Sequence, residues 1–169
     1  MTDFAGEPYR LAADTLGLAE IEAAKAVLDS KILTMGQRVR TFETEFARWV
    51  GSRTAVMVNS GSSANLLMVE ALRRSLPEAQ RLAPGDEVLV PGLSWPTTVW
   101  PVVQLGMVPV FVDVDPATLG LDLLAAEAAI GERTRAMFVI HPLGRALERH
   151  AYADFCRRHG LLLLEDCCE

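Results

Sequence analysis

A serine-rich turn is the first segment of the sequence that could carry chemistry. The residues Asn59-Ser60-Gly61-Ser62-Ser63 join an apolar run to a stretch with helical spacing. A helix start offers free N–H groups and the positive end of the helix dipole, which suit a phosphate. Gly61 would let the backbone approach the anion, and Ser62 and Ser63 would add hydroxyl donors. An ordinary serine cap followed by a glycine turn explains the same residues equally well.

A carboxylate and an indole also follow apolar runs. Asp166 ends the run LLLLED, and a carboxylate at the edge of a buried strand needs a partner. A protonated pyridine nitrogen would be such a partner, although an acidic pair like Glu165-Asp166 more often caps an element or pairs with arginine. Trp95, in the loop GLSWPTT, could stack on a flat cofactor, although core packing is the commoner role of tryptophan. Pro96 restricts Trp95 to extended backbone.

Other polar residues at predicted strand ends favour structural roles. Asp113 and Asp115 could bind a metal or a substrate, but Asp115-Pro116 is typical of a turn. His141 could face a pocket or form a structural hydrogen bond. The three cysteines, Cys156, Cys167 and Cys168, form neither a disulfide framework nor a metal-ligand spacing, so we expect no metal site. We interpret the adjacent pair Cys167-Cys168 as small buried residues rather than nucleophiles.

The elements that must position these residues alternate along the chain. Apolar spacing predicts helices over 18–30, 38–50, 63–74, 97–105, 123–130 and 148–159. In the third of these, the apolar residues on one face are predicted to be Ala64, Leu67, Met68, Ala71 and Leu72. Short apolar runs predict strands over 55–58, 87–90, 108–112, 136–140 and 161–164. This order predicts an α/β architecture, a mainly parallel sheet with helices on both faces, whose ligands gather at the carboxyl edge of the strands.

Composition excludes several classes of protein. The 169 residues carry a net charge of −6, which argues against a nucleic-acid surface. No apolar run is long enough to span a membrane, and the N-terminus does not resemble a signal peptide, so a cytoplasmic location is expected. No G-x-G-x-x-G follows the first predicted strand, which counts against a nicotinamide-binding domain.

The order of the motifs is more specific than any one of them. They are G-x-x-V-x-x-F-E from Gly36 to Glu43, then NSGSSANL, PGDEVLVP, PTTVWPVVQLGMVPVFVDVDPATLGLD, HPLG and LLLLEDCCE. In this order they resemble the DegT/DnrJ/StrS family, which comprises sugar aminotransferases dependent on pyridoxal phosphate (PLP) and related sugar 3-dehydratases. The resemblance runs from about Gly36 to the last residue.

The resemblance implies a fold, a cofactor and roles for individual residues. The fold would be the fold-type-I aminotransferase large domain, in a homodimer that acts on nucleotide-linked keto deoxy sugars with an amino donor. The cofactor would be pyridoxal phosphate or pyridoxamine phosphate. Ser62 and Ser63 would hold its phosphate, Trp95 would stack on its ring and Asp166 would pair with the ring nitrogen. Glu169 would be a polar residue near the ring.

The chain departs from the family pattern at its end. Members continue past the EDCCE segment to a lysine that forms a Schiff base with the cofactor or, in 3-dehydratases, to a histidine. The two lysines, Lys25 and Lys31, match neither position. We therefore expect no catalytic residue within the chain and an incomplete large domain over 36–169, preceded by an arm and helix over 1–35. A 3-dehydratase and a catalytically inactive fragment are the alternatives to an aminotransferase.

Overall fold

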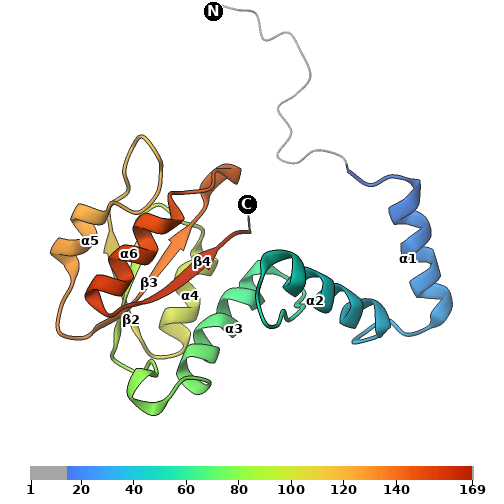
Figure 1. Cartoon of the computed structure of the whole chain (residues 1–169), viewed down its shortest axis with the longest axis horizontal. Coiled ribbons are helices and arrows are strands. Elements are labelled where there is room, and N and C mark those ends of the chain that lie inside the picture. The colour runs from blue at the N-terminus through green and yellow to red at the C-terminus, as the bar shows by residue number, and fades with distance from the viewer. Residues whose placement is uncertain (1–14, 169) are drawn as a thin grey trace, which may run out of the picture. The chain divides into compact units, whose positions relative to one another are not determined.

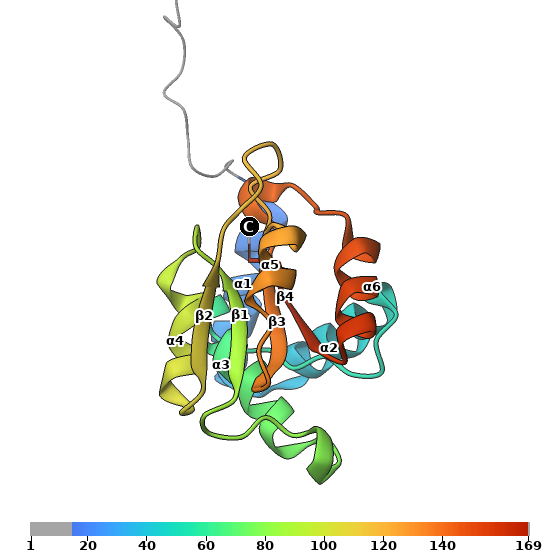
Figure 2. The same cartoon turned by 90° about the vertical axis from the view of Figure 1, so that its left-hand side faces the viewer.

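A parallel four-stranded sheet forms the centre of the fold in the computed structural model, which describes residues 15–168. The strands lie in the order β2-β1-β3-β4, and all neighbouring pairs are parallel (Figure 2). Their bounds are β1 Glu87–Pro91, β2 Val108–Val112, β3 Thr134–Ile140 and β4 Leu162–Asp166. The predicted parallel sheet is therefore confirmed, with four of the five predicted strands.

Helices cover both faces of this sheet, as predicted. Side chains of a strand alternate between faces, so Val88 packs with α3 and α4, whereas Leu89 packs with α5 and α6. Figure 1 shows these helices around the strands. Their bounds are α3 Gly61–Arg74, α4 Pro96–Gln104, α5 Leu123–Ala129 and α6 Arg149–His159, with short 3₁₀ turns at Glu78–Gln80 and Pro142–Gly144. Two apolar clusters, one on each face, make up the core.

Two further helices precede the sheet. They are α1, Leu18–Ser30, and α2, Gln37–Val50, both close to their predicted ranges. Gly51 ends α2 in the left-handed conformation with φ 77°, as expected for a glycine at that position. The chain divides between Met57 and Val58 into two compact units, which we call the N-terminal unit and the sheet unit. The domain boundary predicted between residues 35 and 36 stays a prediction.

The predicted strand over residues 55–58 is wrong. A strand requires a neighbour whose backbone groups pair with its own, and none of the described residues pairs with this segment. The N–H of Met57 instead donates to Oε1 of Glu43 at 2.9 Å. Val56 and Met57 are 66% and 51% exposed, so the apolar side chains that suggested a buried strand are not covered.

No helix within residues 15–168 combines the length and the apolar character needed to cross a bilayer.

Candidate functional site

The serine-rich turn forms the start of α3. The helix begins at Gly61, two residues before the predicted Ser63, and Ser60 is its N-cap. The Ser60 hydroxyl oxygen accepts the N–H of Ser63 at 3.3 Å, and the Ser63 hydroxyl donates to Oδ1 of Asn59 at 2.7 Å. The Ser62 hydroxyl has no hydrogen-bond partner within the described part of the chain. The two serines therefore differ in their hydrogen bonds, since Ser63 braces the turn and Ser62 does not; the phosphate-holding role predicted for both stays a prediction.

Asp166 ends β4 and is buried, with 8% of its surface exposed. Its Oδ2 accepts two hydrogen bonds, from Nδ2 of Asn65 at 2.8 Å and from Oγ1 of Thr98 at 3.0 Å. Its Oδ1 accepts the N–H of Cys168 at 3.1 Å. The carboxylate therefore joins α3, α4 and the end of β4 at the carboxyl edge of the sheet.

Gly61 brings the serine-rich turn close to the end of β4. A Cβ atom at this position would lie 2.7 Å from Sγ of Cys168, closer than side chains approach one another. A side chain at position 61 would therefore require the Cys168 side chain to move. The role predicted for Gly61, backbone approach to an anion, stays a prediction.

Trp95 lies at the start of α4, where it is the N-cap residue. Its φ of −72° and ψ of 141° are extended, and Pro96 follows at the first helical position, so the predicted restriction of Trp95 is confirmed. Its carbonyl accepts the N–H of Thr98 at 3.1 Å. The indole is 73% exposed, so core packing is not its role in this structure.

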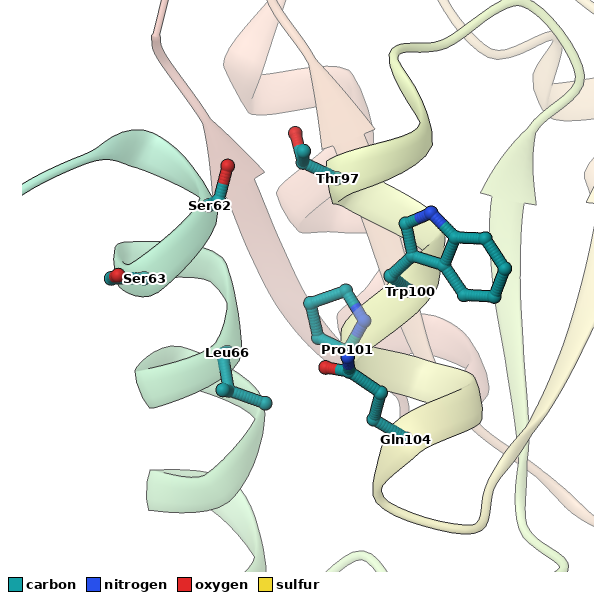
Figure 3. A pocket seen from close by; sticks show the side chains of 7 residues that line it. All are labelled: Ser62, Ser63, Leu66, Thr97, Trp100, Pro101 and Gln104. Carbon is teal, nitrogen blue, oxygen red and sulfur yellow. The ribbon is translucent and has the colours of Figure 1, made fainter.

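An open groove of about 480 Å³ runs between α3 and α4. Ser62, Ser63 and Leu66 of α3 line one side, and Thr97, Trp100, Pro101 and Gln104 of α4 line the other (Figure 3). Neither Trp95 nor Asp166 lines this groove. The structure thus brings the serine turn and Asp166 together through Asn65, and Trp95 is linked to Asp166 through Thr98.

The sequence patterns did not single out Asn65 and Thr98. Both are polar residues at core-facing positions of their helices: Asn65 is four residues before buried Val69, and Thr98 is four before buried Val102. A polar residue within an otherwise apolar helical stripe was the signal that could have identified them.

The remaining polar candidates have structural roles. Asp115 accepts the N–H of Ala117 at 2.8 Å and forms the predicted turn. Nδ1 of His141 accepts the N–H of Leu147 at 3.1 Å, and its Nε2 lies 3.4 Å from Oε1 of Glu165. His141 therefore fastens the loop after β3 to the end of β4. Within residues 15–168, no three His, Cys, Asp or Glu side chains are grouped so that they could hold a metal ion.

The cysteines correct one expectation. Cys167 and Cys168 are exposed rather than buried, because they lie beyond the last paired residue of β4. Partial burial nevertheless raises the pKa of the Cys167 thiol, and the carboxylates of Glu165 and Asp166 raise it further, which disfavours a nucleophilic thiolate. Cys156 is buried, and burial raises the pKa of its thiol to about 11. Glu169 lies outside the described residues, so its role near the ring stays a prediction.

Similar proteins include both dehydratases and aminotransferases. GDP-4-keto-6-deoxy-D-mannose 3-dehydratase of Escherichia coli is 42% identical over 95% of this chain and 41% of its own length. L-glutamine:scyllo-inosose aminotransferase of Streptomyces griseus is 44% identical over 76% of this chain and 28% of its own. A solved structure of the E. coli dehydratase with bound hydrated PLP superposes with a TM-score of 0.87, at 41% identity, over 96% of this chain and 41% of that one.

The chain thus spans about two fifths or less of the length of these relatives. The superposition includes the sheet that carries Asp166, so the fold is that of the N-terminal part of a PLP enzyme of fold type I. The model of the DegT/DnrJ/EryC1/StrS aminotransferase family matches residues 14–169, and the chain therefore belongs to this family.

Proposed function

We propose that the chain is the N-terminal part of a PLP-dependent aminotransferase that acts on nucleotide-linked keto deoxy sugars. The observation that carries the proposal is the buried carboxylate of Asp166, which accepts a hydrogen bond from Asn65, about one helical turn after the serine-rich start of α3. A carboxylate and an anion-binding helix end are the two kinds of group that a phosphorylated pyridine requires. Trp95 adds an exposed aromatic face at the start of the neighbouring helix.

The residues present fit this cofactor in their donor chemistry. Ser62, Ser63 and the first-turn N–H groups of α3 would hold the phosphate, and Ser63 also braces the turn through Asn59. Trp95 would stack on the ring, and Gly61 would keep the turn close to the end of β4. When bound, pyridoxal phosphate supplies a ring that withdraws electrons from bonds at the carbon carrying the amine. Asp166 would hold a proton at the ring nitrogen, which increases that withdrawal.

A sugar 3-dehydratase is the second candidate function. It is favoured by the similarity to the E. coli 3-dehydratase and to dTDP-4-dehydro-2,6-dideoxy-D-glucose 3-dehydratase of Saccharopolyspora spinosa, which is 43% identical over 88% of this chain. The residue that separates the two activities, a lysine or a histidine, is expected after residue 169. Under either activity we expect a cytoplasmic homodimer, an arm and helix over 1–35 and a PLP-binding large domain beginning at residue 36.

Cofactor binding by the 169-residue chain tests the proposal without requiring turnover. Pyridoxamine phosphate is titrated into the purified chain, and binding is followed by absorbance and tryptophan fluorescence. We expect saturable binding that weakens about tenfold or more in Asp166→Ala, because a hydrogen bond to a charged group is lost. Trp95→Ala should weaken binding as well, because a stacking surface is removed.

Matched controls separate site effects from general damage. Asp154→Ala removes an exposed carboxylate of α6, and Trp49→Ala removes an exposed indole of α2; neither should change the affinity. No binding by the folded wild-type chain would contradict the proposal. Equal binding by the wild-type chain and the Asp166→Ala variant would contradict the role of Asp166.

A further inference from the structure

The buried polar side chains of the described residues are concentrated at one point. Four such side chains are buried, those of Asn65, Thr98, Thr134 and Asp166, and three of them form a single hydrogen-bonded cluster. Burial of a polar group is costly unless its hydrogen bonds are made, and an apolar residue of similar shape could fill each position. This concentration of polar groups requires a reason beyond packing.

From this cluster we infer that Asn65 and Thr98 are positioning residues, which fix the Asp166 carboxylate in one orientation and keep it as the charged, hydrogen-bond-accepting partner of a protonated ring nitrogen. The inference rests on the proposed function, because it concerns how Asp166 meets the cofactor. It assigns roles to two residues that do not themselves hold the cofactor.

The direction of the Asn65 hydrogen bond is fixed by a second contact. Nδ2 of Asn65 lies 3.2 Å from the carbonyl oxygen of Thr97 as well as 2.8 Å from Oδ2 of Asp166. A backbone carbonyl only accepts hydrogen bonds, so the amide group facing it must be the NH₂. Asn65 therefore donates to Asp166, and Oδ2 must act as an acceptor.

The two oxygens of Asp166 have different surroundings. Oδ2 accepts donors from two helices, at 2.8 Å from Asn65 and 3.0 Å from Thr98, whereas among residues 15–168 Oδ1 accepts only the N–H of Cys168, at 3.1 Å. A carboxylate oxygen has room for about two hydrogen bonds. Oδ1 therefore keeps an acceptor site for a ring N–H, and the donors at Oδ2 set the plane in which it lies.

Donors aimed at Oδ2 also decide where a shared proton resides. Hydrogen bonds to a carboxylate stabilise its charged form, so a proton shared with a pyridine nitrogen stays on the nitrogen. When one donor is removed, the proton should move toward the carboxylate. This change concerns the position of a proton, which a loss of packing alone would leave unaltered.

The experiment uses the 169-residue chain and pyridoxamine phosphate labelled with ¹⁵N in the ring. Thr98→Val keeps the shape of the side chain and removes the hydroxyl, and Asn65→Leu removes the amide. In both variants we expect about tenfold weaker binding and a shift of the ring ¹⁵N resonance, at constant pH, toward that of unprotonated pyridine. Thr98→Ser, which restores a hydroxyl, should recover the wild-type resonance.

Thr134→Val provides a matched control. Thr134 is also buried, but its hydroxyl contacts Glu87 and the N–H of Gly131 rather than Asp166. Its loss should leave both the affinity and the resonance unchanged. Near-ultraviolet circular dichroism shows which variants are folded, and Thr98→Val decides the matter if Asn65→Leu does not fold.

The outcomes separate this inference from the proposed function. If the folded wild-type chain binds no pyridoxamine phosphate, the proposed function fails. If the wild-type chain binds and a folded Thr98→Val variant shows an unchanged ring resonance, Thr98 is only structural and the inference fails. A shifted resonance in Thr98→Val, restored in Thr98→Ser, supports the inference.

Discussion

The helices α2 and α3 have the same length of 14 residues but bury very different amounts of apolar surface. In the sheet unit, α3 packs Val69 against the strands and leaves it with no exposed surface. In the N-terminal unit, Ala47 is the one residue of α2 that is buried, and Trp49 at its end is 83% exposed. An amphipathic pattern therefore predicts a helix without predicting that its apolar face is covered.

Aromatic side chains on the exposed face of α2 contact one another. The rings of Phe42 and Phe46 stack with centroids 5.5 Å apart, and those of Phe46 and Trp49 are 6.1 Å apart. The first helix, α1, buries none of its residues. The two units should consequently differ in stability, because burial of apolar surface is the main favourable term in folding.

The largest expected effect compares matched phenylalanine substitutions. Phe138→Ala in β3 removes a fully buried ring and should lower the free energy of unfolding by about 3–5 kcal/mol. Phe46→Ala in α2 removes a half-exposed ring and should change it by less than about 0.5–1 kcal/mol. Urea unfolding followed by circular dichroism measures both values.

If Phe138→Ala does not fold, a less destabilising substitution at the same position can be compared with Phe46→Ala. Phe138→Leu retains an apolar side chain and should cost about 1–2 kcal/mol. Equal effects of Phe138→Leu and Phe46→Ala would contradict the contrast between the two units.

Amide hydrogen exchange should also differ between the two units, and this is the second largest effect that we expect. Amides of β3 pair with both β1 and β4, so they should exchange through unfolding of the whole sheet unit. Amides of α1 belong to a 13-residue helix without buried side chains, and such helices are marginal on their own. We expect α1 amides to exchange at least about 1,000-fold faster than those of β3, measured by mass spectrometry of peptides. Comparable protection would mean that α1 is stabilised by contacts not described above.

Local patterns predicted most of the elements but not their environment. Apolar periodicity gave α1 and α2 within a residue or two of their bounds, because it is a property of neighbouring residues along the chain. It failed for residues 55–58, because a strand also needs a partner elsewhere in the chain. The apolar face predicted for α3 included Leu67, which is 44% exposed, whereas Asn65 is buried.

The site residues that follow predicted strands could be predicted from the sequence, whereas those inside helices could not. Ser62, Trp95 and Asp166 each follow an apolar run, which is visible in the sequence. Asn65 and Thr98 lie inside helices, and their contact with Asp166 spans 101 and 68 positions of the chain. Such a contact depends on the order of strands in the sheet, which sequence patterns do not specify.

The smallest expected effect concerns a buried thiol. The N-terminal unit contains no cysteine, so Cys156 reports on the sheet unit alone. Burial raises the pKa of its thiol from 9.0 to about 11, so at pH 8 the thiolate fraction is about 100-fold smaller than for a free thiol. The exposed Cys168 should react with iodoacetamide at pH 8, Cys167 should react more slowly because its pKa is raised, and Cys156 should remain unmodified in the folded chain.

Reactivity of the Cys156 thiol in increasing urea tests whether the two units unfold separately. As urea increases, Cys156 should become reactive only when the sheet unit unfolds, whereas circular dichroism reports helices of both units. We expect part of the helical signal to be lost before Cys156 reacts, because α1 and α2 bury little. Above pH 9 the sheet unit should lose stability, since the unfolded thiol ionises first and the folded thiol only near 11. Coincident transitions at pH 8 would instead indicate that both units unfold as one.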